Sequence, residues 1–138
     1  MSNLIKNVII DKSGIPLLEK FLDLSSTRQK LIAGNLANVS TPNYKSKDID
    51  FHGELKKAVG QSEHIAGKLT NPAHLPLGQN KNSAPEVIVN DSRDANGINN
   101  VDVDREVANL ARNQIYYSVG AQILARKITG LKNAIKSK

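Results

Sequence analysis

The sequence predicts a mainly α-helical protein, in which two long amphipathic helices at the two ends of the chain pack as an antiparallel, coiled-coil-like pair joined by a loop-rich middle. Two observations predict this class. Apolar residues recur at helical spacing near both ends, whereas glycine and proline interrupt residues 46–101. The composition agrees, because only 4% of the 138 residues are aromatic and tryptophan is absent. Such a chain lacks the large side chains that fill a thick globular core.

The N-terminal helix is expected within residues 16–45. For residues 1–15 before it, the apolar residues leave two alternatives open, a short helix or a segment that becomes ordered only on assembly. Pro16 suits the first turn of a helix. Two apolar patches follow, Leu17, Leu18, Phe21 and Leu22 in the first and Leu31, Ile32, Leu36 and Val39 in the second. The helical pattern does not explain the polar residues 25–30 between them. Gly34 and Ala37 predict a close approach of the other helix.

The C-terminal helix is expected within residues 102–138. Alternating steps of four and three residues meet eight large apolar side chains at ten positions, a spacing typical of a coiled-coil seam. The eight are Val103, Val107, Leu110, Tyr117, Leu124, Ile128, Leu131 and Ile135, with Gln114 and Ala121 between them. A helix over 103–136 is about 50 Å long, so it needs an equally long partner. We expect it to pack on Leu18, Phe21, Leu22 and Ile32 and to leave apolar surface for neighbouring molecules.

Residues 46–101 predict loops with short β or helical pieces. Asp48 and Asp50 alternate with Ile49 and Phe51 as in a short strand, residues 56–59 suit the end of a short helix, and residues 86–90 suit a second strand. Glycine and proline predict an extended segment over residues 61–85. A loop longer than about 12 to 15 residues is usually functional or disordered.

The chain offers little for catalysis or for metal and cofactor binding. It contains no cysteine, which excludes disulfides and thiolate chemistry. His52, His64 and His74 are too widely spaced for a helical metal pair, and the calcium-like loop from Ser92 to Val103 lacks the required acidic residues at both ends. We therefore expect no enzymatic activity, no cofactor, no metal and no small-molecule substrate. No stretch approaches the roughly 20 apolar residues that span a bilayer, and the first residues do not resemble a cleaved signal peptide.

The net charge of +6 leaves one alternative open, a small basic DNA-binding or nucleoid-associated helical protein. Such a protein binds duplex DNA in a salt-sensitive manner. Five basic residues crowd the end of the predicted C-terminal helix, where cations interact favourably with the terminal carbonyls; these are Arg126, Lys127, Lys132, Lys136 and Lys138. Aromatic residues do not interleave with them as in single-strand binders. We interpret the cluster as a solvated helix end and expect no nucleic-acid partner.

Residues 28–51, RQKLIAGNLANVSTPNYKSKDIDF, combine a helix end with a sharp turn. Ser40 and Thr41 offer hydroxyl groups to the helix end, and Pro42 prevents the helix from continuing. Pro42 and Asn43 suit the central positions of a type II turn, the second of which requires a positive φ. We expect Tyr44 to fold back as an anchor.

This segment resembles the signature of flagellar rod, hook and related axial proteins, a pattern close to ANNLANVSTPGYK. The matching residues are Ala33, Asn35, Leu36, Ala37, Asn38, Val39, Ser40, Thr41, Pro42, Tyr44 and Lys45. Gly34 replaces an asparagine and Asn43 replaces a glycine, but asparagine tolerates a positive φ. Residues 47–58, 71–77 and 96–124 are similar to the proximal rod members of this family.

The resemblance implies a structural subunit of the proximal rod of the flagellar basal body, which transmits torque from the MS ring towards the hook and filament and is required for motility. It implies export by the flagellar type III apparatus without a cleaved signal peptide, and assembly in the periplasm. The implied partners are copies of the same chain, other proximal rod proteins, the adaptor protein FliE at the rod base and, through it, the MS ring.

Overall fold

The computed structural model of the protein describes residues 14–60, 84–92 and 97–136. Its elements are α2 (Ile15–Ala37), β1 (Lys47–Ile49), α3 (Phe51–Val59), β2 (Val87–Val89) and α4 (Val103–Lys136). The expectations for residues 1–13 and 61–83, and for the centre of the calcium-like loop, concern residues outside this description. The mainly helical class is confirmed, with a long helix near each end and a loop-rich middle.

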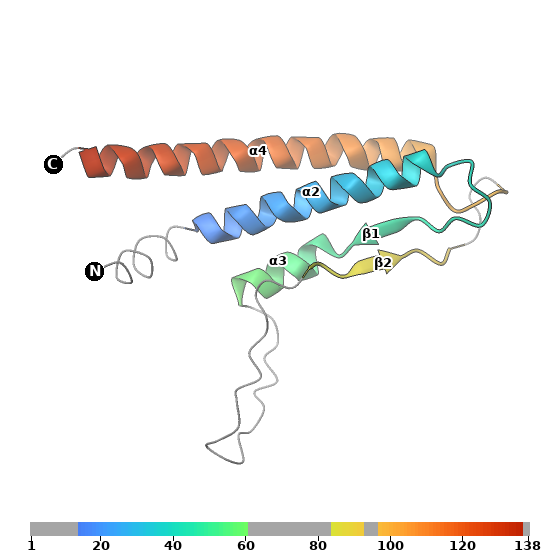
Figure 1. Ribbon diagram of the computed structural model, residues 1–138. Helices are drawn as coiled ribbons and strands as arrows, with labels where there is room; N and C mark the ends of the chain where they lie inside the picture. The colour runs from blue at the N-terminus through green and yellow to red at the C-terminus, as the bar shows by residue number, and fades with distance from the viewer. Residues whose placement is uncertain (1–13, 61–83, 93–96, 137–138) are drawn as a thin grey trace, which may run out of the picture.

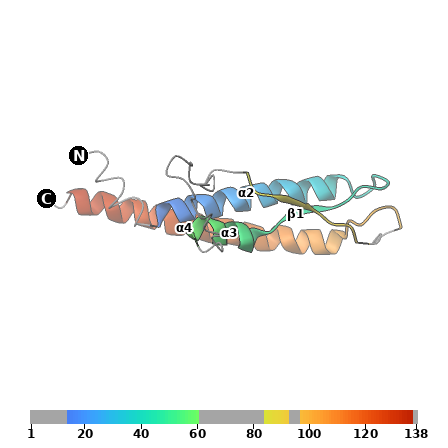
Figure 2. The same ribbon diagram turned by 90° about the horizontal axis from the view of Figure 1, so that it is seen from below.

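The two long helices lie side by side and run antiparallel (Figure 1, Figure 2). Asn113 in the first half of α4 bonds to Ser25 of α2. Lys127 in the second half of α4 lies near the start of α2, because a Cβ added at Gly14 would be 3.3 Å from the Nζ atom of Lys127. α4 has 34 residues and α2 has 23. Because each residue adds 1.5 Å, α4 is roughly 16 Å longer than its partner.

The ends of α2 follow from local sequence. Gly14 adopts the left-handed conformation before the first turn, and a proline occupies that turn. The helix ends at Ala37, where the Asn38 N–H also donates to the Asn35 carbonyl at 3.1 Å and the Val39 N–H donates to the Leu36 carbonyl at 3.3 Å. These bonds span three residues instead of the four of an α-helix, so the last turn tightens and the helix ends here.

The glycine that allows contact between the helices is Gly120 of α4, so the prediction of Gly34 and Ala37 was wrong. A Cβ at Gly120 would lie 2.9 Å from Cδ1 of Phe21 and 3.2 Å from Cδ2 of Leu22. A Cβ at Gly34 meets nothing within 4 Å, and Ala37 is exposed. The Phe21 ring therefore requires a residue without a side chain on the opposite helix.

β1 and β2 form an antiparallel pair in which Lys47 faces Val89 and Ile49 faces Val87. Both predicted strands are confirmed, but the first ends before Phe51. The Asp50 side chain accepts the N–H of Gly53 at 2.9 Å and caps α3, so Phe51 begins a helix instead.

The core is small. The buried apolar side chains of the described residues are Leu24, Ile32, Ile49 and Val101. Phe21 adds an edge-to-face contact with Phe51, with ring centroids 5.2 Å apart. No helix in the described part of the chain combines the length and apolarity needed to cross a membrane.

Candidate assembly site

The turn after α2 has the predicted geometry. Asn43 has a φ of 58°, and the N–H of Tyr44 donates to the Thr41 carbonyl at 3.3 Å, which closes the turn around Pro42. The Tyr44 hydroxyl donates to Oδ1 of Asn35 at 3.2 Å, so the tyrosine folds back onto α2 as predicted. The Thr41 hydroxyl donates to the side chain of Asn38.

Asn99 fixes this turn from a distant part of the chain. Its Nδ2 donates to the carbonyls of Asn38, Val39 and Thr41 at 3.0, 2.8 and 3.0 Å, and its Oδ1 accepts the N–H of Val101 at 2.9 Å. The side chain is fully buried. One asparagine therefore satisfies three carbonyls of the turn that follows α2 and holds this turn against the segment that leads into α4.

The sequence interpretation missed Asn99. The available signal was its position in the asparagine-rich run before α4, inside the stretch that resembles proximal rod proteins. No local pattern distinguishes a buried asparagine from an exposed turn residue.

Two further asparagines attach the sheet. Asn35 of the motif donates to the Lys47 carbonyl and accepts the Lys47 N–H, both at 2.9 Å. Asn100 accepts the N–H of Ser46 and donates to the carbonyl of Asn90, both at 2.7 Å. The motif thus joins α2 to β1, and the segment before α4 joins both strands.

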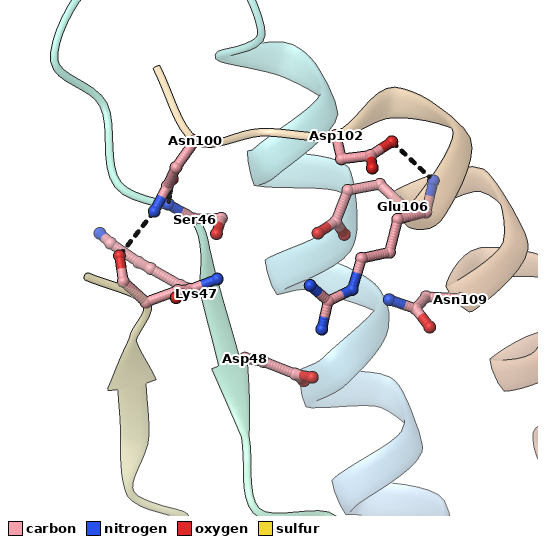
Figure 3. Close-up of a pocket in the computed structure, with 9 residues that line it drawn as sticks. Ser46, Lys47, Asp48, Asn100, Asp102, Glu106 and Asn109 are labelled. Carbon is pink, nitrogen blue, oxygen red and sulfur yellow. Dashed lines mark hydrogen bonds between the residues drawn. The ribbon is translucent and has the colours of Figure 1, made fainter. Parts of the chain in front are cut away.

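A polar cluster fills the space between β1 and the start of α4 (Figure 3). Arg28 of α2 forms an ion pair with Asp48 of β1 at 2.6 Å, and Asp102 caps α4 by accepting the N–H of Arg105. Glu106 is only 9% exposed. Burial raises the pKa of Glu106 and the charge of Asp48 adds to the shift, whereas Asn35, Arg105 and Arg28 oppose it.

This cluster does not have the properties of a ligand site. The cavity that it lines has a volume of about 50 Å³, far below the roughly 300 Å³ of a small-molecule pocket. Within residues 14–60, 84–92 and 97–136, no group of three or more acidic, histidine or cysteine side chains could hold a metal ion.

Contacts with other elements explain part of the polar stretch of α2, residues 25–30. Asn113 of α4 is buried and donates to the Ser25 carbonyl at 2.9 Å and to Oε1 of Gln29 at 2.8 Å. The Ser25 hydroxyl donates to the Phe21 carbonyl. Within this stretch, the polar side chain of Gln29 accepts from Asn113 of α4, and that of Arg28 pairs with Asp48.

The predicted packing residues differ in their burial. On α2, Ile32 is buried, and Leu18, Phe21 and Leu22 are half-buried. On α4, Leu110, Leu124 and Leu131 are half-buried, whereas Val103, Val107, Tyr117, Ile128 and Ile135 are exposed. The buried residues of α4 are Glu106, Asn113 and Gly120, at seven-residue spacing. α4 therefore faces α2 with a line of two polar residues and one glycine, and much of the apolar surface of α4 lies outside this contact.

A second apolar stripe runs along α4. Ile115, Val119 and Ile123 are 61, 49 and 42% exposed. Their spacing of four residues places them in one stripe, which lies opposite the line of Glu106, Asn113 and Gly120 at Ile115 and approaches that line at Ile123. The sequence interpretation followed one seam and missed this stripe.

Comparisons with known proteins identify relatives over most of the chain. The flagellar basal body rod protein FlgB of Salmonella typhimurium is 35% identical over 124 residues, covering 86% of this chain and 89% of that protein. The FlgB of Bacillus subtilis is 34% identical over 120 residues, covering 87 and 88%. The FlgB of Borrelia hermsii is 33% identical over 133 residues, covering 92 and 98%. No family model matches the chain. The identities and coverage show that this chain belongs to the FlgB family of flagellar basal body rod proteins.

Proposed function

We propose that this rod subunit has no enzymatic activity and acts in the proximal rod, where it transmits torque from the MS ring towards the hook and filament and is required for motility. The observation that carries the proposal is the apolar surface of α4. Nine of its large apolar residues are at least 40% exposed, namely Val103, Val107, Ile115, Tyr116, Tyr117, Val119, Ile123, Ile128 and Ile135. Extensive exposed apolar surface indicates a protein–protein contact.

Torque transmission requires that neighbouring subunits do not slide past one another. Long helices in contact along their length make many small van der Waals contacts, which must be broken together before the helices shear. The exposed seam residues Val103, Val107, Tyr117, Ile128 and Ile135 are the surface that we expect neighbours to cover. The motif residues 33–44 hold the turn and so fix the direction of β1 relative to α2.

The proposed partners are further copies of the chain, other proximal rod proteins, the FliE-type adaptor at the rod base and, through it, the MS ring. The proposed location is the periplasmic rod of the basal body, reached through the flagellar type III apparatus without a cleaved signal peptide. The small core supports this proposal, because binding to neighbours stabilises a marginal fold by mass action. The family assignment supports these partners and gives no support to the DNA-binding alternative.

The proposal is tested by complementing a deletion strain of the source bacterium. The deletion should remove rod, hook and filament, and the intact chain should restore them. Ile128→Asp should fail to restore swimming, because an unpaired charge buried in a helix interface costs several kcal/mol. Leu124→Asp should fail as well. Since Ile128 is 40% exposed in the free subunit, the isolated Ile128→Asp variant should keep its helical circular dichroism.

Ser118→Asp is the matched control, because it adds the same charge to an exposed polar position of α4. It should restore swimming and complete basal bodies in electron micrographs. Normal assembly with Ile128→Asp would contradict the proposed packing.

A further inference from the structure

Within the part of the chain that the structure describes, the outer edge of the small sheet is open. Among the described residues, no strand lies against the far side of β2 (Figure 1). Its residues Val87, Ile88 and Val89 are 44, 50 and 49% exposed and all β-branched. Proteins usually protect a sheet edge with a charge, a proline or a covering element. None of the three strand residues is charged or proline, so β2 is competent to pair with another strand.

The hydrogen bonds to β1 determine which backbone groups β2 offers. Asn90 donates its N–H to the Ser46 carbonyl at 2.8 Å, so this pair is of the hydrogen-bonded type. Hydrogen-bonded and non-hydrogen-bonded pairs alternate along antiparallel strands. Ile88 therefore also directs its backbone groups to β1. Val87 and Val89 direct their N–H and C=O groups to the free edge.

We propose that this edge binds the same edge of a second copy of the chain, by antiparallel pairing about a two-fold axis at Ile88. The sequence of β2, Val-Ile-Val, reads the same in both directions. Pairing places Val87 opposite Val89 of the second copy and Ile88 opposite Ile88. The free groups then match, because each pair of valines exchanges two N–H···O=C bonds, and the central isoleucines form a non-hydrogen-bonded pair.

Charge and sequence favour a second copy over an unrelated extended segment. In this register Glu86 lies opposite Asn90 of the second copy, so no like charges oppose each other directly. β2 has no charged or hydrogen-bonding side chain that would select another sequence. Cross-strand contacts between β-branched residues stabilise antiparallel pairs, and its own copy supplies such a contact at every position.

The contact is independent of the proposed function. β2 and α4 lie on opposite sides of α2 (Figure 1), so pairing leaves the apolar surface of α4 uncovered. A two-fold contact uses the same patch on both copies and closes after two. It therefore joins free subunits in pairs and does not extend a helical assembly.

Disulfide trapping of the full chain tests the pairing, because the natural sequence has no cysteine. Ile88→Cys places two thiols in a non-hydrogen-bonded pair, with Cα atoms about 4.5 Å apart, inside the range of a disulfide. Val87→Cys places the two cysteines diagonally, roughly 8 Å apart, beyond that range. Mild oxidation should give at least about tenfold more covalent dimer with Ile88→Cys than with Val87→Cys.

A second variant tests the backbone bonds. Val89→Pro in the Ile88→Cys chain removes an N–H that faces the free edge and keeps the bonds to β1. The trapped dimer should disappear while helical circular dichroism is unchanged. Absence of dimer with Ile88→Cys, equal dimer with both cysteine variants, or a dimer that survives Val89→Pro would each overturn the proposed pairing.

Discussion

The two ends of the contact between α2 and α4 are held by different chemistry. At the motif end, Asn99 just before α4 binds main-chain carbonyls of the turn after α2, and Asn113 of α4 binds a main-chain carbonyl of α2 in the middle of the contact. Further along, the Phe21 ring packs on Gly120. Hydrogen bonds between buried groups are directional and allow one geometry, whereas apolar burial is non-directional. The asparagines therefore set the register of the two helices, and the glycine sets their spacing.

Asn99→Ala removes the hydrogen bonds at the polar end of the contact and should lower the free energy of unfolding most. The change removes three bonds to carbonyls and one from the N–H of Val101 at a fully buried site. Leaving a buried polar group unsatisfied costs about 1–3 kcal/mol, so we expect the free energy of unfolding to fall by roughly 3 kcal/mol, measured by urea denaturation. The half-buried Asn109 provides the control, and its change to alanine should cost less than about 1 kcal/mol. Equal losses would mean that Asn99 has no special role.

Two glycines of α4 offer a matched test of the apolar end. Gly120→Ala brings a methyl group within 2.9 Å of the Phe21 ring, which also contacts Phe51 and Tyr116. Overpacking costs about 1–3 kcal/mol, partly offset by the better helix propensity of alanine. Gly130→Ala meets nothing within 4 Å and should raise the free energy of unfolding by up to about 1 kcal/mol. If both variants were stabilised in thermal melts, the helices would not be in contact at Gly120.

Glu106→Gln removes the buried charge at the polar end of the contact. Of the three substitutions, it should change the free energy of unfolding least. The pKa of Glu106 is raised above its ordinary value of 4.5 in the folded state. The folded state therefore holds the proton more tightly, and stability falls as pH rises from 4.5 through the raised value. Glu106→Gln should be more stable than the natural chain at pH 7, and the difference should vanish at pH 4.

Asp104→Asn is the control for this pH dependence, because Asp104 is an exposed acidic residue in the same turn of α4. It should lower stability slightly at pH 7, since it removes a negative charge from a helix N-terminus. If Glu106→Gln differed in stability from the natural chain by the same amount at pH 4 and at pH 7, burial of the charge could not be the cause.

Local patterns predicted the elements well. The predicted helix over 103–136 has the bounds of α4, and both short strands occur near their expected positions. Helices and turns depend on neighbours in sequence, as the positive φ of Asn43 illustrates. The motif turn was predictable for the same reason.

The face of α4 that meets α2 could not be predicted in this way. Apolar periodicity assumes an apolar buried line, but this line contains Glu106, Asn113 and Gly120. Each is explained only by a partner from a distant segment, as Asn113 is by Ser25, 88 positions away. The role of Asn99 likewise depends on carbonyls about 60 positions earlier.

The long separation of the two helices in sequence has a consequence for folding kinetics. Residues 38–102 connect α2 to α4, and bringing the two ends of an unfolded segment of this length together costs roughly 4 kcal/mol of chain entropy by the logarithmic law. A helical hairpin with a loop of two to five residues does not have this cost. Because contacts such as Asn113 to Ser25 span most of the chain, helix pairing must wait for a slow conformational search. We therefore expect the newly made chain to remain open for longer than a local helical hairpin would, and pairing of α2 with α4 to limit the rate at which the subunit folds.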